Sequence, residues 1–521
     1  MGVFEQVVPS GLRARIEAIQ QRWNLQLILA TGGAAVLLLL AAVIGALTMD
    51  HGGKHVATGR RGSQNVNAAG NEVVPGETTT SVAGGPGATA AAAAGAASKT
   101  GAAAAGAGAL PVTKLGEQST AGATRVGVFP DHVLWGLHAP QTFDGKPLSL
   151  AADPLEGVGI YLTALNNSGG INNRKIQEIF ADDRYTTDGA SQAADKLIND
   201  SHVFSISGTL GVDQVAIVAK RASQTSPAPT PYMAAGASER AFKSEGIRMY
   251  QIGGSYDTHL KELVHFLAKQ VNDPSSIYFH KKRIAVSVLD SPYIIDPVKA
   301  MGDEVSHTPG LEWAGYVPVP KFTDPNNTHN YSNQIQELKK KGAEIVVPAQ
   351  DPLTTGLETE QCLAQGCTWK WTFSDFAHDE DIALGLQGGG PPWAGVRGLS
   401  GGCYYQDYNK GFNCGQLKAA HDAWVSVKSE SDWQQHGQSG VAGYQVVHFW
   451  IEAMRNAGAD LTRERFTAAL NAYNNYDDLV TGPITFAGSP NTVHGIDLMA
   501  VYEGQSNGHW KMISNGLVGP F

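Results

Sequence analysis

The stretch that decides the fold is DPLEGVGIYLTALNNSGGINNRKIQEIFADD, residues 153–183. Apolar residues recur at helical spacing from Leu155 to Leu165, so they predict an amphipathic helix with one buried face. The pair Gly169-Gly170 is typical of a helix end, and residues 176–180 then have the apolar composition of a buried strand. The segment therefore predicts one helix followed by one strand, the repeating unit of an α/β protein.

The same alternation continues from Thr124 to the end of the chain. Strands joined by helices through short connections form parallel sheets with right-handed crossovers. Nearly 400 residues exceed one comfortable hydrophobic core, so we expect two α/β lobes. The predicted strands are residues 125–129, 176–180, 203–207, 284–289, 345–347 and 369–373.

Composition and charge exclude several classes of protein. The formal net charge of −10 argues against a nucleic-acid binder, which needs a basic face. The sequence has no phosphate-binding P-loop, no His-Glu-x-x-His zinc motif and no complete dinucleotide fingerprint, so we expect no cofactor and no metal. Gly398-Leu-Ser400-Gly-Gly402 fits the Gly-x-Ser-x-Gly pattern of hydrolases, but prolines precede it and a predicted strand follows. We therefore expect no enzyme.

An uncharged run over residues 25–49 predicts a membrane anchor. At 1.5 Å per residue the run makes about 37 Å of helix, enough to cross a bilayer core of about 30 Å. A cleaved signal peptide has a shorter apolar region, although a long cleaved signal stays the alternative. We assign residues 1–23 to a cytoplasmic lead-in and residues 24–49 to a transmembrane signal anchor.

Residues 50–123 predict a flexible tether. Between Ser81 and Leu110 there are 15 alanines and 7 glycines, and no pattern there is amphipathic. Frequent glycine disfavours helix, so the segment acts as a spacer before the domain at 124–521.

The four cysteines indicate the compartment. Cys362 and Cys367 form one short-range pair, and Cys403 and Cys414 form a second. No matching metal-ligand cluster is near them, so two sequential disulfides are the simpler interpretation, in an oxidising compartment. Basic residues flank the predicted anchor equally on both sides, so the disulfides decide its orientation: cytoplasmic amino terminus, extracytoplasmic domain.

Four motifs in order carry a resemblance to a known family: residues 164–176, Gly208-Thr-Leu-Gly211, Tyr232-Met-Ala-Ala-Gly236 and Thr481-Gly-Pro-Ile-Thr-Phe486. With them, residues 124–521 resemble the type I periplasmic solute-binding proteins, in the leucine/isoleucine/valine-binding branch that serves ABC importers. The resemblance implies two doubly wound parallel-sheet lobes with ligand between them. It also implies three hinge crossings, near residues 252–255, 398–402 and 479–483. The lobes would comprise residues 124–252 with 399–480, and residues 255–397 with 483–521.

The resemblance also implies ligand-binding positions, and some of them depart from the family. Val212 aligns with a serine that holds a ligand carboxylate, and Gly236 stands where amino-acid binders use threonine. Asp375 falls where the family places an acidic partner for a ligand ammonium, and Tyr293 matches an aromatic of the second lobe. The full predicted set is Trp135, Thr209, Gly211, Val212, Asp213, Ala235, Gly236, Ser238, Tyr293, Gln350 and Asp375.

Together these features predict a membrane-tethered solute-binding protein. We expect it to capture a small polar solute, an amino acid or a related amine or amide, by hinge closure. An ABC-type permease would then receive the solute. Two alternatives stay open: the ectodomain of a ligand-sensing receptor that signals through a partner, and a ligand-free interaction module. The departures at Val212 and Gly236 keep the second of these open.

Overall fold

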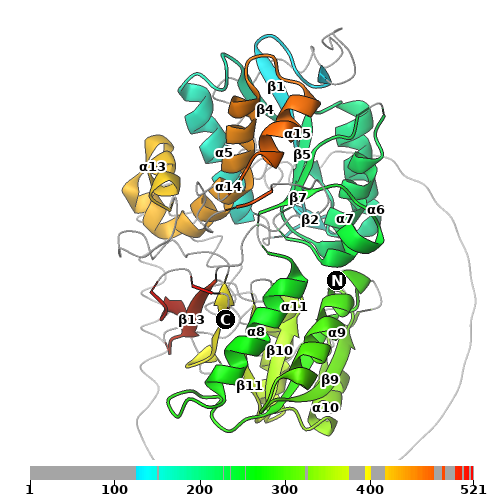
Figure 1. Ribbon diagram of the computed structural model, residues 1–521, viewed down its shortest axis with the longest axis vertical. Helices are drawn as coiled ribbons and strands as arrows, with labels where there is room; N and C mark the ends of the chain where they lie inside the picture. The colour runs from blue at the N-terminus through cyan, green and yellow to red at the C-terminus, as the bar shows by residue number, and fades with distance from the viewer. Residues whose placement is uncertain are drawn as a thin grey trace, which may run out of the picture. The chain divides into compact units, whose positions relative to one another are not determined.

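The residues that the structure describes all lie within the segment Ala93–Phe521 (Figure 1). No helix in the described ranges is long and apolar enough to cross a membrane, and the predicted anchor at 24–49 lies outside them. The structure is a computed structural model that describes residues 125–148, 152–226, 228–234, 236–252, 254–322, 327–374, 393–400, 417–474, 484–486, 499–506, 510–515, 518–519 and 521.

The first lobe is built on a five-stranded parallel sheet, ordered β4-β1-β5-β6-β7. Its strands are β1 (His132–Ala139), β4 (Lys175–Asp182), β5 (Ser205–Gly208), β6 (Tyr232–Ala234) and β7 (Tyr250–Gln251). Its helices are α5 (Ala152–Asn167), α6 (Thr187–Ala194), η4 (Asp195–Asp200), α7 (Val212–Ser223), η5 (Arg240–Ser244), α13 (Leu417–Val427), α14 (Glu430–Ala457) and α15 (Arg463–Asn471). A short hairpin, β2 (Thr142–Phe143) with β3 (Lys146–Pro147), follows β1.

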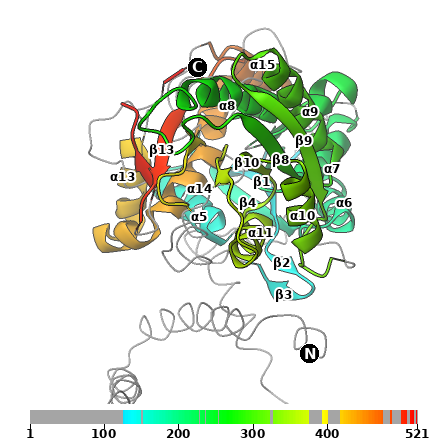
Figure 2. The ribbon, with the colours of Figure 1, turned by 90° about the horizontal axis from the view of Figure 1, so that it is seen from below.

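The second lobe has a four-stranded parallel sheet, ordered β11-β10-β8-β9, with helices packed around it (Figure 2). Its strands are β8 (Arg283–Leu289), β9 (Glu312–Val319), β10 (Ile345–Ala349) and β11 (Lys370–Trp371). Its helices are α8 (Tyr256–Gln270), α9 (Pro292–His307), α10 (Ser332–Lys340) and α11 (Pro352–Ala364). A separate antiparallel sheet, β12 (Arg397–Ser400), β13 (Ala500–Gly504) and β14 (Trp510–Met512), was not predicted.

The parallel α/β character of both lobes is confirmed, but the predicted first strand is wrong. Residues 125–129 form a turn with a single bridge from Val128 to Val133, and the strand is His132–Ala139. Every residue of that strand is buried: parallel strands pair with it on both sides, and helices cover both faces of a sheet of this kind. The longer buried run, residues 132–139, forms the central strand of the sheet. The shorter apolar run, residues 125–129, forms the turn before that strand.

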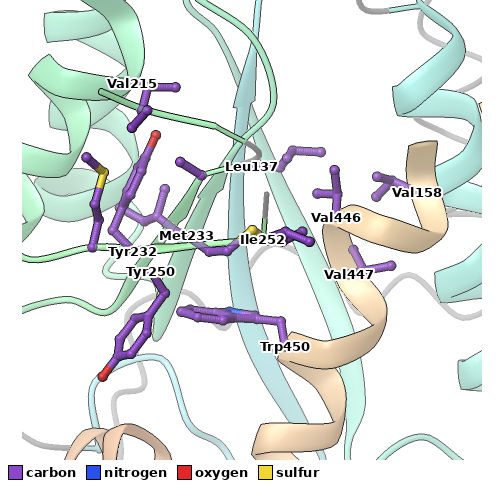
Figure 3. Close-up of a cluster of buried hydrophobic side chains, with 14 of the residues drawn as sticks. Leu137, Val158, Val215, Tyr232, Met233, Tyr250, Ile252, Val446, Val447 and Trp450 are labelled. Atoms are coloured by element: carbon purple, nitrogen blue, oxygen red, sulfur yellow. The ribbon is translucent and has the colours of Figure 1, made fainter. Parts of the chain in front are cut away.

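One face of the first sheet packs against α14 (Figure 3). The Trp450 ring lies beside Tyr250 of β7, with the ring centroids 6.1 Å apart, and its indole nitrogen donates to Ser205 Oγ at 2.9 Å. Val446 and Val447 fill the space between this sheet and α5. Burial of these large side chains, at about 25 cal/mol per Å² of apolar surface, attaches a helix from late in the chain to the first lobe.

The chain passes between the lobes at the places that the sheets define. The first crossing lies between Gln251 of β7 and Tyr256 of α8. The second was predicted near residues 398–402; residues 398–400 belong to β12, and residues 401–416 lie outside the described residues. The predicted third crossing at 479–483 is too early, because the amide of Phe486 still donates to Tyr473 O in the first lobe. That crossing therefore follows Phe486.

One of the two predicted disulfides lies in the described region. Cys362 and Cys367 are bonded at the end of α11, with Cα atoms 5.3 Å apart. Cys403 and Cys414 lie outside the described residues, so their pairing stays a prediction.

Candidate functional site

The predicted ligand loops lie at the carboxyl ends of the parallel strands, where open α/β sheets bind ligands. Gly208, Ala234 and Gln251 pair in one row across β5, β6 and β7, so the loops that follow these strands leave the same edge of the first sheet. Loops of the second lobe contact this edge directly, as the following bonds show.

Asp213 joins the two lobes. It lies in the first turn of α7, and its Oδ1 accepts a hydrogen bond of 2.9 Å from Ser291 Oγ of the second lobe. Its Oδ2 lies 2.6 Å from Lys321 Nζ, two residues after β9. Asp213 is only 7 % exposed and Ser291 is fully buried, so the bridge is largely shielded from water.

The residues before Asp213 shape the same loop. Val212 packs against the apolar cluster of the second lobe, so the position predicted to hold a ligand carboxylate makes an apolar contact between lobes. Gly211 precedes α7 with φ +92°, a conformation that glycine adopts without strain. A Cβ atom on Gly211 would also collide with Gln214. The positive φ is therefore the reason for glycine at this position, and a larger residue would also require Gln214 to move.

Tyr185 lies among carboxylates of both lobes. Burial raises the pKa of its hydroxyl well above 10, and the charges of Asp351, Asp183 and Asp213 raise that pKa further. Asp351 caps α11 by accepting from Thr354 N at 2.9 Å, and Asp183 accepts from the amide of Tyr185 itself at 2.9 Å. The field around this buried hydroxyl is therefore negative.

A second bridge between the lobes involves Tyr293, which was predicted to cover the ligand. Its hydroxyl donates to Glu245 Oε1 of the first lobe at 3.0 Å. Burial, and then the contact with Glu245, raise the pKa of Tyr293 to about 12. Beside it, Arg240 Nη1 of the first lobe donates to Asp296 Oδ2 of the second at 2.7 Å. Tyr293 therefore links lobe to lobe through its polar end.

Some of the buried polar atoms without partners lie at strand ends of the two lobes or a few residues after them. Within the described residues, the hydroxyls of Thr209, Ser238 and Ser374 have no hydrogen-bond partner. The amide of Gln251, fully buried at the end of β7, has neither its nitrogen nor its oxygen paired. Thr209 and Ser238 were predicted, whereas Gln251 and Ser374 were not. Since a buried polar group left unpaired costs about 1–3 kcal/mol, four of them at strand ends indicate a place for a polar partner.

Gly236 stands where a threonine was expected because Tyr256 needs the space. A Cβ atom on Gly236 would lie 3.0 Å from the ring of Tyr256, the first residue of α8. Ala235 and Asp375 lie outside the described residues, so their ligand contacts stay predictions.

Gln350 faces the interior of the second lobe. Its Nε2 donates to Glu358 Oε2 at 2.7 Å, and Ser287 Oγ donates to both oxygens of Glu358, at 2.9 and 2.7 Å. All three side chains are buried. Burial raises the pKa of Glu358 to about 7, although the two donors oppose the shift. The polar end of Gln350 is therefore occupied by a neighbour in its own lobe.

Trp135 does not join this group. It is fully buried in β1, and its indole nitrogen donates to Ser207 Oγ of β5 at 3.2 Å. It was predicted in a loop because the first strand was assigned too early; in the middle of the central strand it is a core residue.

A buried chain of polar groups supports the loop at Gly208. His138 Nδ1 lies 2.8 Å from Asp183 Oδ2, and His138 Nε2 lies 2.6 Å from the hydroxyl of Tyr232. A Cβ atom on Gly208 would collide with both partners of the second bond. Glycine at this position therefore permits the bond between His138 and Tyr232.

The structure brings Val212, Asp213 and Tyr293 to the contacts between lobes, together with residues that were not predicted. Thr209 and Gly211 lie in the loop before α7. Ser291 and Asp351 each precede a proline at a helix start, a capping signal that could have identified both positions. Lys321 carried no such signal. Among the described residues, no group of three or more His, Cys, Asp or Glu side chains is arranged to hold a metal.

Comparison with known proteins identifies the class of fold first. The fatty acid ABC transporter substrate-binding protein of Thermomonospora curvata is 15 % identical with a TM-score of 0.60, and the match covers 76 % of this chain and 94 % of that one. The branched-chain amino acid transporter substrate-binding protein of Streptococcus pneumoniae, solved with isoleucine, is 15 % identical with a TM-score of 0.57, covering 75 % and 100 %. A branched-chain amino acid ABC transporter protein of Thermus thermophilus, solved with valine, is 12 % identical with a TM-score of 0.58, covering 75 % and 96 %. At these identities the likeness shows the fold: two α/β lobes of the type I periplasmic-binding class.

The family follows from the sequence. The profile of the periplasmic binding protein family matches residues 140–509, and the chain belongs to that family. The resemblance to the leucine/isoleucine/valine-binding-like branch is confirmed. The family is one of solute-binding proteins, in agreement with the expectation that the chain is no enzyme. No curated protein matches the chain.

Proposed function

We propose that this protein is a membrane-anchored, extracytoplasmic solute-binding protein that captures a small polar solute, an amino acid or a related amine or amide, and delivers it to an ABC-type permease. The single observation that carries ligand capture is the set of unpaired buried polar groups at the strand ends, above all the amide of Gln251. A solute bound between the lobes would supply the hydrogen bonds that these groups lack.

Contacts between the lobes support capture by hinge closure. The bridges at Asp213 and Tyr293 each join one residue of the first lobe to the second lobe, so they form only when the lobes meet. Solutes that bind between the lobes stabilise the closed state, in which the lobes are in contact, because they add contacts that an open state lacks.

Anchoring and delivery rest on the sequence. Residues 24–49 would hold the protein in the membrane with the domain outside, and the tether at 50–123 would let the domain reach a permease. Tethering raises the effective concentration of the domain at a docking surface in the same membrane.

The test is a binding screen with the full chain purified in detergent. Amino acids, their amides, the corresponding amines and small carboxylates are each added at millimolar concentration, and the unfolding temperature is recorded. A solute present at about a thousand times its Kd adds about 4 kcal/mol of stability, which raises that temperature. If no solute of any class raises it, the protein is better described as a ligand-free interaction module. That outcome would agree with Val212, whose contact with the second lobe needs no ligand.

A further inference from the structure

The second lobe presents an anion-binding position to the first. Ser291 caps the amino end of the 16-residue helix α9, where backbone N–H groups and the helix dipole favour negative charge. Its hydroxyl and the ammonium of Lys321 reach the same carboxylate, one at each oxygen. A hydroxyl, a cation and a helix amino terminus together are the usual means by which proteins hold a carboxylate.

That position is already filled from within the chain. Asp213 supplies the carboxylate, and it lies in the first turn of α7, whose own helix dipole favours its charge. Its side chain is 11 % exposed and that of Lys321 is 33 % exposed. A solute carboxylate that took the place of Asp213 would leave a nearly buried charge without its cation, which is strongly unfavourable.

The surroundings oppose a second carboxylate as well. Asp183, Asp213 and Asp351 all act on the buried hydroxyl of Tyr185, and each raises its pKa. An added anion between the lobes would meet this negative field, whereas an added cation would be attracted by it. The unpaired groups of Gln251, Ser238 and Ser374 are neutral, and they suit the donors and acceptors of an amide.

We propose that Asp213 is a resident carboxylate that determines specificity: it occupies the anion-binding position between the lobes, so the site takes amines and amides and excludes solutes with a free carboxylate. This inference rests on the proposed function and narrows it, because it separates amides and amines from the amino acids themselves.

The experiment compares matched pairs of probes by isothermal titration on the full chain in detergent. Leucine is compared with leucinamide, and benzoate with benzamide, so that each pair differs only in the carboxyl group. In the wild-type protein at least one amide binds, and it binds at least tenfold more tightly than its acid. Asp213→Asn frees Lys321, so the affinity for the acid relative to that for its amide rises by at least tenfold. Lys321→Met removes the cation, so the acid still binds more weakly than its amide.

Asp296→Asn is the matched control. It removes a carboxylate that also bridges the lobes, through Arg240, but lies outside the anion-binding position, so the ratio of amide to acid binding stays unchanged.

Any of four results overturns the inference. If an acid binds the wild-type protein as tightly as its amide, the inference is wrong and the proposed function stands. An unchanged ratio in Asp213→Asn, or an equal change in Asp296→Asn, shows that Asp213 acts only as a contact between lobes. Failure of all four probes to bind the wild-type protein overturns the inference, whereas the proposed function is judged by the wider screen of solutes.

Discussion

Glu358 offers a sharp test of the energetics of the second lobe. Its carboxyl group is fully buried, and its partners are the hydroxyl of Ser287 and the amide of Gln350, both neutral. In Glu358→Gln, the new amide oxygen can accept from Gln350 and the new N–H can donate to Ser287. The variant therefore reproduces the protonated carboxyl group, apart from one additional N–H donor, and it removes the ionisation.

The magnitude follows from the pKa. Burial raises the pKa of Glu358 from 4.5 to about 7. Between these values the folded state binds more protons than the unfolded state, so stability falls as pH rises through this window. The two pKa values differ by about 2.5, and each pKa unit corresponds to 1.36 kcal/mol, so the ionised carboxylate costs the folded protein about 3 kcal/mol. The full cost applies above about pH 7.

We therefore expect Glu358→Gln to match the wild-type protein at pH 4.5 and to exceed it by up to about 3 kcal/mol at pH 8. Guanidinium unfolding followed by tryptophan fluorescence at both pH values measures the difference. Glu337→Gln, whose side chain on α10 is 51 % exposed, is the control and should change stability by less than about 0.5 kcal/mol at either pH. The reasoning is refuted if the effect of Glu358→Gln is the same at both pH values, or if the variant is less stable at pH 8.

Three further predictions concern other parts of the domain. Gln251→Met removes an unpaired buried amide, so we expect the free energy of unfolding of the ligand-free protein to rise by about 1–2 kcal/mol in chemical unfolding. Any solute found in the screen should bind this variant more weakly. A loss of stability would mean that the amide is paired. Gly208→Ala places a methyl group against Tyr232 in a packed interior, and should cost about 2–4 kcal/mol in the same assay, whereas a neutral result would contradict the close packing. Replacing Cys362 and Cys367 by serine opens a short loop and should cost about 2 kcal/mol in the same assay. A reductant added to this variant should then remove only the contribution of the second predicted bond, between Cys403 and Cys414, and an unchanged stability would contradict that bond.

Much of the fold could be predicted because it rests on local patterns. The helix at α5 and the strand at β4 follow from apolar spacing and a glycine stop, and both were predicted within a few residues. The disulfide between Cys362 and Cys367 follows from short spacing. The strand at His132–Ala139 was missed because two apolar runs stand close together, and only pairing with both neighbours decides which becomes the central strand.

The candidate site was less predictable, because its contacts join residues distant in the chain. The resemblance to the family pointed to Thr209, Ser238 and Asp213, but it did not point to the partners of Asp213. Ser291 Oγ meets Asp213 across 78 positions of sequence, and Lys321 reaches the same carboxylate from a different strand end. A lysine after a strand has no pattern that distinguishes it from a solvated surface lysine.

The sequence therefore determined the class of fold, since periodicity and turn residues act over a few positions, and its resemblance to the family predicted the loops for a solute. Tertiary structure decided what those loops do. Packing turned Val212 into an apolar contact and assigned Gln350 to Glu358. It also placed the carboxylate of Asp213 against a cation and a helix end of the other lobe, because charge pairing and burial depend on distances that only the folded chain sets.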